Sequence, residues 1–376
     1  MALAAALFIS PSPAKFSGSS ISFSPRFSSP RLKNSIGIRC ISSSADPAKG
    51  TLVTERPSIS SKSGNWQWRF QDTPINIYYE ESTEERSANK KNILMIPSIS
   101  DVSTVDEWRV VAQDIVAREG NVNWSATIVD WPGLGDSERP LLNYSADVME
   151  HFLVQFMNAV DSPLRNSGED LVIAGGGHAA TIALRAAGKG LIKPSAIAAV
   201  APTWSGPLPI VFGRSSEMES RYGLLRGTLR APAVGWMMYN VLVSNEKAIE
   251  SQYKSHVYAD PGNVTPSVVK SRYALTKRKG ARYAPAAFLT GLLDPVKTRD
   301  EFLDLFAKLD GEIPILVVSA KNAPKRSKAE MDALEGAKGV TKFVEVPGAL
   351  LPQEEYPSTV AEELSKFLQS VSLVSS

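Results

Sequence analysis

The sequence has few of the residues that build covalent cross-links or metal sites. Its single cysteine, Cys40, excludes an internal disulfide and leaves no cysteine pair for a metal. Its three histidines, His151, His178 and His256, are far apart in the chain and form no metal-ligand motif. We therefore expect no metal site.

Long hydrophobic runs are missing as well. No stretch of about 18 apolar residues occurs without a charge, which excludes a membrane-spanning helix and leaves only peripheral membrane contact. With 43% hydrophobic and 21% charged residues, the 376-residue chain can still build one large or two modest cores. A wholly disordered chain is excluded.

The first 45 residues contain no Asp or Glu, are rich in serine and carry five basic residues. This composition is typical of an organelle transit peptide, and the surroundings of Cys40 resemble a chloroplast cleavage site. We predict a transit peptide at 1–40 and a stromal location in the chloroplast, with membrane association as the alternative. A disordered tail is the other interpretation. Removal of this segment leaves 36 basic and 39 acidic residues, a balance that does not favour a nucleic-acid partner.

Beyond a predicted linker at 41–65, short apolar runs alternate with amphipathic stretches. This rhythm is typical of an α/β domain with a mostly parallel sheet, which we place at 66–204 and 291–374. A hairpin is predicted from 66–70 and 75–79. Buried strands are predicted at 93–96, 126–129, 171–174, 196–200 and 313–318, and helices at 108–116, 148–160, 179–187 and 302–309.

The segment 205–290 interrupts this rhythm and is predicted to form a lid. It contains twelve basic and five acidic residues, and the run 276–279 could attract an anionic ligand or an anionic plastid membrane. A solvated basic face is the alternative. The uncharged stretch 231–243, which includes Trp236, is interpreted as the underside of the lid and not as a membrane anchor.

The segment 130–140 reads D-W-P-G-L-G-D-S-E-R-P and follows a predicted buried strand. It resembles the D-x-P-G-x-G-x-S loop of the α/β-hydrolase fold, and the order of elements from about 66 to 373 resembles that fold too. The resemblance implies a twisted, mostly parallel eight-stranded sheet with helices on both faces. It also implies a pocket beneath the lid, at the carboxyl ends of the strands.

Enzymes of this family use a nucleophile, an acid and a histidine. The resemblance places the nucleophile position at Gly177, within the pentad G-G-G-H-A at 175–179. It places the acid position at Ala323 and the histidine position at Leu350. None of these side chains can perform the family's chemistry, so a serine-hydrolase mechanism is not expected.

A ligand pocket is still expected around the turn at Gly177, where the N–H groups of two residues would face it by analogy with the family. The residues expected to line it are Ser98, Ile99, Gly177, His178 and Trp204. The alternative is that the glycines only permit close packing of strand and helix. The match of 175–180 to a dinucleotide fingerprint is weak because no acidic ribose partner follows, and no cofactor is expected.

His178 is the strongest candidate for any acid–base role, with Asp101, Ser98 or Ser100 as its expected partners. The alternative is a histidine that is simply satisfied at the start of a helix. Asp294 is interpreted either as a helix cap or as a pocket carboxylate.

Two functions follow from these residues. The first is noncatalytic binding of a small, partly apolar molecule, or a scaffold role. The alternative is an active hydrolase or lyase that acts on an ester or lipid-like substrate through a rearranged site around His178.

Overall fold

The computed structural model describes residues 59–84, 90–119, 122–165 and 170–374. The predicted transit peptide and Cys40 lie outside the described residues, as does the linker up to residue 58. The described residues belong to one compact unit.

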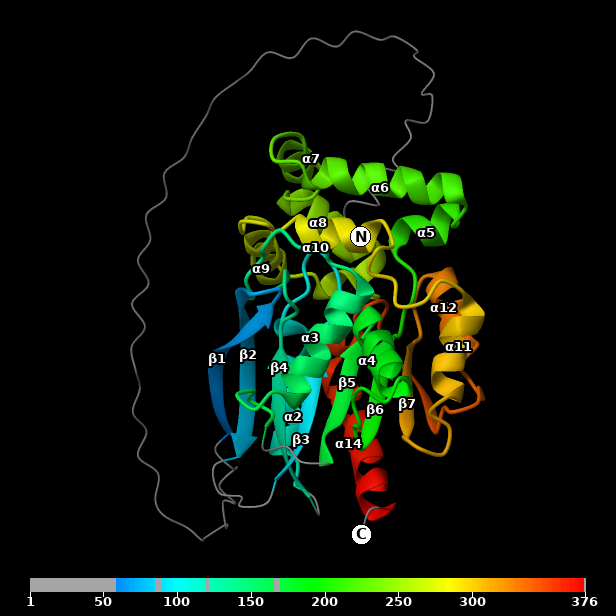
Figure 1. Ribbon diagram of the computed structural model, residues 1–376. Coiled ribbons are helices and arrows are strands. Elements are labelled where there is room, and N and C mark those ends of the chain that lie inside the picture. The colour runs from blue at the N-terminus through cyan, green and yellow to red at the C-terminus, as the bar shows by residue number, and fades with distance from the viewer. Residues whose placement is uncertain (1–58, 85–89, 120–121, 166–169, 375–376) are drawn as a thin grey trace, which may run out of the picture. The chain divides into compact units, whose positions relative to one another are not determined.

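Eight strands within the described part of the chain form a single sheet in the order β1-β2-β4-β3-β5-β6-β7-β8 (Figure 1). Strand β2 is antiparallel to β1 and β4, and the other pairs are parallel. The predicted mostly parallel eight-stranded sheet is confirmed. The strands are β1 (Ile59–Phe70), β2 (Thr73–Glu84), β3 (Lys90–Ile96), β4 (Asn123–Val129), β5 (Val172–Gly176), β6 (Ala196–Val200), β7 (Ile315–Ala320) and β8 (Lys342–Val346).

The first hairpin is longer than the sequence predicted. Strand β1 begins at Ile59 and pairs with β2 along its whole length, so 59–65 is strand and not linker. These residues lie on an edge strand and are mostly polar and exposed, so no apolar alternation marks them as a strand. The turn that joins the two strands places Gln71 and Asp72 at positive φ.

Helices cover both faces of the sheet. Helices α2 (Asp106–Ala117) and α14 (Pro357–Val374) pack on one face, and α3 (Ala146–Asn158), α4 (His178–Gly188) and α11 (Arg299–Ala307) pack on the other. Four of these helices overlap the predicted ones, because their apolar positions recur at helical spacing. Two shorter helices complete this part of the fold: α12 (Lys325–Asp332) follows β7, and α13 (Pro352–Glu355) follows β8.

Between β6 and α11 the chain forms further helices, of which we call α5 to α10 the cap helices. They are α5 (Pro207–Phe212), α6 (Ser216–Arg230), α7 (Val234–Leu242), α8 (Glu246–Gln252), α9 (Pro266–Thr276) and α10 (Tyr283–Leu289). Figure 1 shows them beyond the carboxyl ends of the strands, with α6 and α7 outermost. No helix in the described part of the chain is long and apolar enough to cross a membrane.

The interpretation of 231–243 as the underside of a lid was wrong. On α7, Trp236, Met237 and Val241 are 59%, 56% and 67% exposed. The inward face of the helix is formed by Gly235 and Tyr239, which are buried. Gly235 lies so close to α6 that a Cβ there would come within 2.1 Å of the Leu229 carbonyl oxygen. This close approach fixes the rotation of α7 and turns Trp236, Met237 and Val241 outward, whereas Met238 and Leu242 pack partly inward.

The cap helices are held to the sheet domain by a buried arginine. Arg272 of α9 is 2% exposed, and its guanidinium pairs with Asp106 of α2 at 3.2 Å and with Glu354 of α13 at 2.5 Å. Its Nε donates to the Tyr253 hydroxyl at 3.1 Å. Because an unpaired buried charge would be costly, these contacts favour one position of α9.

A buried carboxyl group anchors the loop that follows β3. Glu107 of α2 is 2% exposed and accepts hydrogen bonds from the Ser98 N–H at 2.8 Å and the Ser98 hydroxyl at 2.9 Å. The Gln353 amide donates to it at 3.2 Å. Burial, together with the nearby charge of Glu354, raises the pKa of Glu107 from 4.5 to about 7. The carboxyl therefore takes up a proton in the folded protein at a pH where the unfolded chain has lost it.

This shift predicts a pH-dependent contribution to stability. Between the unfolded pKa of 4.5 and the folded pKa of about 7, the folded state binds more protons, so the free energy of unfolding falls as the pH rises. The change is on the order of 3 kcal/mol. We expect Glu107→Gln, which preserves the shape and can still accept from Ser98, to remove this dependence. Urea unfolding at several pH values, with the exposed Glu335→Gln as control, measures it. Parallel curves for Glu107→Gln and the wild type would contradict the assignment.

Candidate functional site

The turn between β5 and α4 has the geometry that the fold reserves for a nucleophile. Gly177 adopts φ 52° and ψ −126°, a conformation that strains other residues. Gly175 serves packing instead, since a Cβ there would lie 2.8 Å from the backbone nitrogen of Ala180. Close packing of strand and helix therefore accounts for Gly175, whereas the positive φ of Gly177 is a separate requirement of the turn.

The space beside Gly177 is occupied by a hydroxyl group. A Cβ built on Gly177 would lie 3.3 Å from Oγ1 of Thr203 and 3.6 Å from Cβ of Ser98. Thr203 belongs to the loop after β6, and Ser98 to the loop after β3. The carboxyl ends of three neighbouring strands thus converge on this turn.

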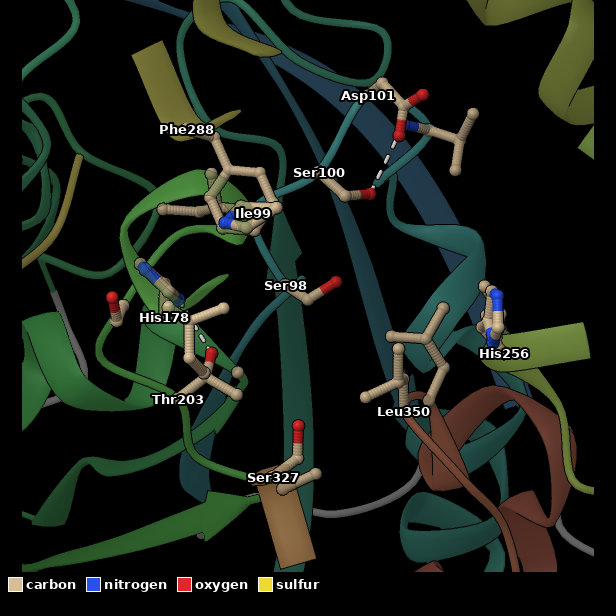
Figure 2. A pocket seen from close by; sticks show the side chains of 18 of the residues that line it. Ser98, Ile99, Ser100, Asp101, His178, Thr203, His256, Phe288, Ser327 and Leu350 are labelled. Atoms are coloured by element: carbon tan, nitrogen blue, oxygen red, sulfur yellow. Dashed lines mark hydrogen bonds between the residues drawn. The ribbon is translucent and has the colours of Figure 1, made fainter. Parts of the chain in front are cut away.

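A cavity of about 330 Å³ opens at the same place (Figure 2). Ser98, Ile99, Gly177, His178 and Trp204, the residues expected to line a pocket, all line it. The remaining walls come from the segment between α5 and α10, from α12 and from the segments after β3, β6 and β8. The lining is mostly apolar and includes Ile99, Val102, Trp204, Pro207, Ile210, Val211, Ile249, Val257, Phe288, Leu350 and Leu351.

The polar groups of the cavity are hydroxyls, two carboxylates, two imidazole rings and the amide of Gln252. Hydroxyl groups come from Ser98, Ser100, Thr203, Ser205 and Ser327. Asp101 and Glu330 are the acidic residues in the wall, whereas the residues that line it include no Lys or Arg. An anionic ligand would meet no opposite charge in these walls, so they are suited to an uncharged molecule.

His178 is buried in the wall of this cavity, with 1% of its surface exposed. Its Nδ1 lies 2.7 Å from Oγ1 of Thr203, and its Nε2 lies 3.3 Å from Oδ1 of Asp294. Burial lowers the pKa of His178 to about 3, with a further contribution from Arg214, so the ring is neutral at physiological pH. The prediction that Asp101, Ser98 or Ser100 would be the partner of His178 was wrong, because Thr203 and Asp294 engage its two ring nitrogens.

The partners define the tautomer of the ring. The carboxylate of Asp294 is ion-paired with Arg214 and can only accept, so Nε2 of His178 carries the hydrogen. Nδ1 is then an acceptor, and the Thr203 hydroxyl donates to it. The result is a chain of contacts from Arg214 through Asp294 and His178 to a hydroxyl group at the cavity.

Asp294 is not a helix cap. Helix α11 begins five residues later and is capped by the Thr298 side chain, which accepts from the Glu301 N–H. The Asp294 side chain is 1% exposed and also accepts from the Gly206 N–H at 2.8 Å. It therefore joins the loop after β6 to the cap helices. No sequence motif marked Arg214 as a site residue, because only the fold of the cap helices brings it to Asp294.

Ala323 and Leu350, which the resemblance assigns to the acid and histidine positions, follow β7 and β8. Ala323 packs near Ala201, Ala320 and Met331 and is not among the residues that line the cavity. Leu350 lines the cavity, and its N–H donates to the carbonyl oxygen of Val257 at 3.0 Å.

The remaining histidines lie apart from His178. His256 is exposed and lines the cavity on the side of Leu350, across from His178 in Figure 2. His151 of α3 lies outside the cavity and packs its ring against Trp68 and Phe70 of β1. Within 59–374, apart from the three short undescribed gaps, no three His, Cys, Asp or Glu side chains are arranged to hold a metal ion.

Comparison with known proteins agrees with this architecture. Among solved structures, a haloalkane dehalogenase, DatA, from Agrobacterium tumefaciens C58 is similar with a TM-score of 0.58 at 17% identity, over 83% of this chain and 97% of that one. A thermophilic esterase from Thermogutta terrifontis gives 0.56 at 14% identity, over 82% and 99% of the two chains. A bromoperoxidase from Bacillus anthracis gives 0.55 at 13% identity, over 81% and 100%. These identities show a shared fold alone.

Comparison with curated protein sequences finds no match. The model of one protein family, described as the alpha/beta hydrolase family, matches residues 102–363, which is more than half of the chain. The matched range includes the turn at Gly177, the cap helices and β8. The chain belongs to the alpha/beta hydrolase family.

Proposed function

We propose that this protein binds a small, uncharged and largely apolar molecule in the cavity beside Gly177, without the hydrolytic chemistry of its family. The observation that carries the proposal is the turn itself. Gly177 holds the backbone of a nucleophile turn, with φ 52°, and has no side chain to react. Further support is that Ala323 and Leu350, which follow β7 and β8, are the residues that the resemblance assigns to the family's acid and histidine positions.

Loss of all three groups matters more than loss of one. A hydroxyl nucleophile is weak unless a base removes its proton, and the base needs a partner that fixes its orientation. Enzymes that lose the triad keep only the catalysis that comes from binding and the oxyanion site. A serine at position 177 would therefore not by itself restore the family reaction.

Binding, in contrast, requires only what the cavity provides. Its volume of about 330 Å³ and its apolar lining suit a small molecule that gains by leaving water. The hydroxyl protons of Ser98 and Thr203 are donated to Glu107 and His178, so their oxygens can accept a hydrogen bond from a hydroxyl group of the ligand. We infer that the cap helices serve as the lid over this ligand, a role that favours a binding protein over a scaffold.

A larger side chain in the cavity wall should weaken binding of the ligand. We expect Leu350→Trp, which extends a larger ring from the wall, to weaken binding of the uncharged dye Nile red by about tenfold or more. Fluorescence titration of the dye measures this, with the exposed Leu191→Trp as control. Equal affinity of wild type and Leu350→Trp would place the dye elsewhere and contradict the proposed pocket.

A second candidate function is supported by the contacts of His178. The Thr203 hydroxyl donates to Nδ1 of His178, and Nε2 donates to the carboxylate of Asp294. Hydroxyl, imidazole and carboxylate in this order are the groups of a hydrolytic triad, displaced to the loop after β6. The proton of Thr203 could pass to His178 as Thr203 attacks an ester carbonyl. The low pKa of His178, about 3, makes the ring a weak base and favours the binding role.

The two functions predict different effects of two substitutions, Thr203→Val and His178→Ala. On short- to long-chain p-nitrophenyl esters we expect Thr203→Val, which keeps the shape of the side chain, to leave the rate within the scatter of the wild type. His178→Ala should behave in the same way. If both variants instead lost about a hundredfold in rate while circular dichroism showed an intact fold, the displaced triad would be the correct function.

We also propose that the protein acts in the chloroplast stroma after removal of residues 1–40. The support is the absence of Asp and Glu from the first 45 residues, together with their five basic residues. Import of the labelled chain into isolated chloroplasts should give a shorter, protease-protected product whose N-terminus lies near Ile41. A full-length product, or one that remains accessible to protease, would contradict this location.

A further inference from the structure

The outer face of α7 exposes several apolar side chains. Val234, Trp236, Met237 and Val241 are all exposed, and Asn240 is the one polar residue between them. A helix that is apolar on all sides is normally buried. Here the inner side packs on α6 while the outer side faces away from the sheet domain (Figure 1).

Positive charge adjoins this face, and the acidic residues of α6 lie in its first turn, where Glu217 pairs with Arg221. Residues 220–245, which span most of α6 and all of α7, contain three arginines and no Asp or Glu. Lys277 extends from the end of α9 to this helix, where its Nζ lies 3.4 Å from Oδ1 of Asn240 and 3.3 Å from the Ser244 carbonyl oxygen. Lys279, nearby in the chain, is exposed as well.

We propose that α7 is a docking surface for an anionic lipid membrane. An apolar helical face of this size, with a tryptophan and flanking lysines, matches the chemistry of the boundary between headgroups and acyl chains. The apolar side chains would enter this boundary, and Lys277 and Lys279 would pair with anionic headgroups. A soluble protein partner would need to present an apolar surface of its own. The positive charge near α7 does not complement an apolar surface.

The membrane contact then includes the neighbouring helix α7 as well as the basic run at 276–279. Charges of that run attract the protein to the surface, whereas burial of the α7 side chains holds it there. This inference does not depend on what the cavity binds, since no residue of α7 is among those that line it.

Trp236 offers a local readout. Of the seven tryptophans, all of which lie in the described part of the chain, Trp66, Trp68, Trp108, Trp124 and Trp131 are buried and Trp204 is half-buried. Only Trp236 is exposed. Lipids brominated in their acyl chains quench tryptophan that enters the bilayer, so they should quench Trp236 and leave the buried rings unaffected. The readout is also unaffected by any binding of residues 1–40, which contain no tryptophan.

The experiment uses the full chain with phosphatidylcholine vesicles that do or do not contain phosphatidylglycerol, at low and high salt. We expect quenching by brominated lipid on the anionic vesicles, weakened by salt. Trp236→Phe should remove the quenching but keep flotation with the vesicles. The double variant Trp236→Ser with Met237→Ser should lower the vesicle affinity by about tenfold or more relative to the exposed control Leu191→Ser.

Three outcomes would overturn the proposal. The first is an absence of quenching on anionic vesicles at low salt. The second is equal vesicle affinity of the double variant and the control. The third is a concentration-dependent dimer in sedimentation velocity that the double variant abolishes, without any vesicle binding, which would show that a second copy of the chain covers α7.

Discussion

The buried contact between His178 and Asp294 connects the parts of the molecule that form the site. A histidine ring that is taken out of water must have both nitrogens satisfied, or its burial destabilises the fold. Thr203 and Asp294 satisfy them, and Asp294 in turn binds the Gly206 N–H and Arg214. One network thus fixes the turn after β5, the loop after β6 and the start of the cap helices relative to one another.

The same network limits the chemistry of the site. It resembles a proton relay, because a hydroxyl, an imidazole and a carboxylate follow one another. Burial and the nearby Arg214 guanidinium nevertheless disfavour the imidazolium that such a relay must form, so the pKa of His178 falls to about 3. A ring that stays neutral is well suited to hold a wall in place. This is the physical reason for preferring a ligand-binding role in a family with many enzymes.

The cap helices are treated differently on their two sides. On the inner side Arg272 is fully enclosed and paired with carboxylates of the sheet domain, so α9 is held firmly. On the outer side α7 leaves Trp236 and Met237 in contact with solvent. The cap therefore combines a fixed inner surface, which shapes the cavity, with an outer surface that is still available to a partner.

The sequence by itself determined the order of the elements and the place of the site. Apolar runs and helical spacing are local properties, so β3 to β7 and the main helices were predictable, as was the cavity beside Gly177. The segment 59–65 and β8 were not recognised as strands, because edge strands are half-exposed and carry no apolar pattern.

Only the tertiary structure decided which groups meet. Asp294 is separated from His178 by more than one hundred residues of sequence, and the local pattern between α10 and α11 could not distinguish a helix cap from a partner of the His178 ring. The orientation of α7 depends on the close approach of Gly235 to Leu229, since a helix with apolar residues on every side gives no periodic signal. Pairing across the chain and the rotation of an apolar helix are set by packing, which no single segment of the sequence specifies.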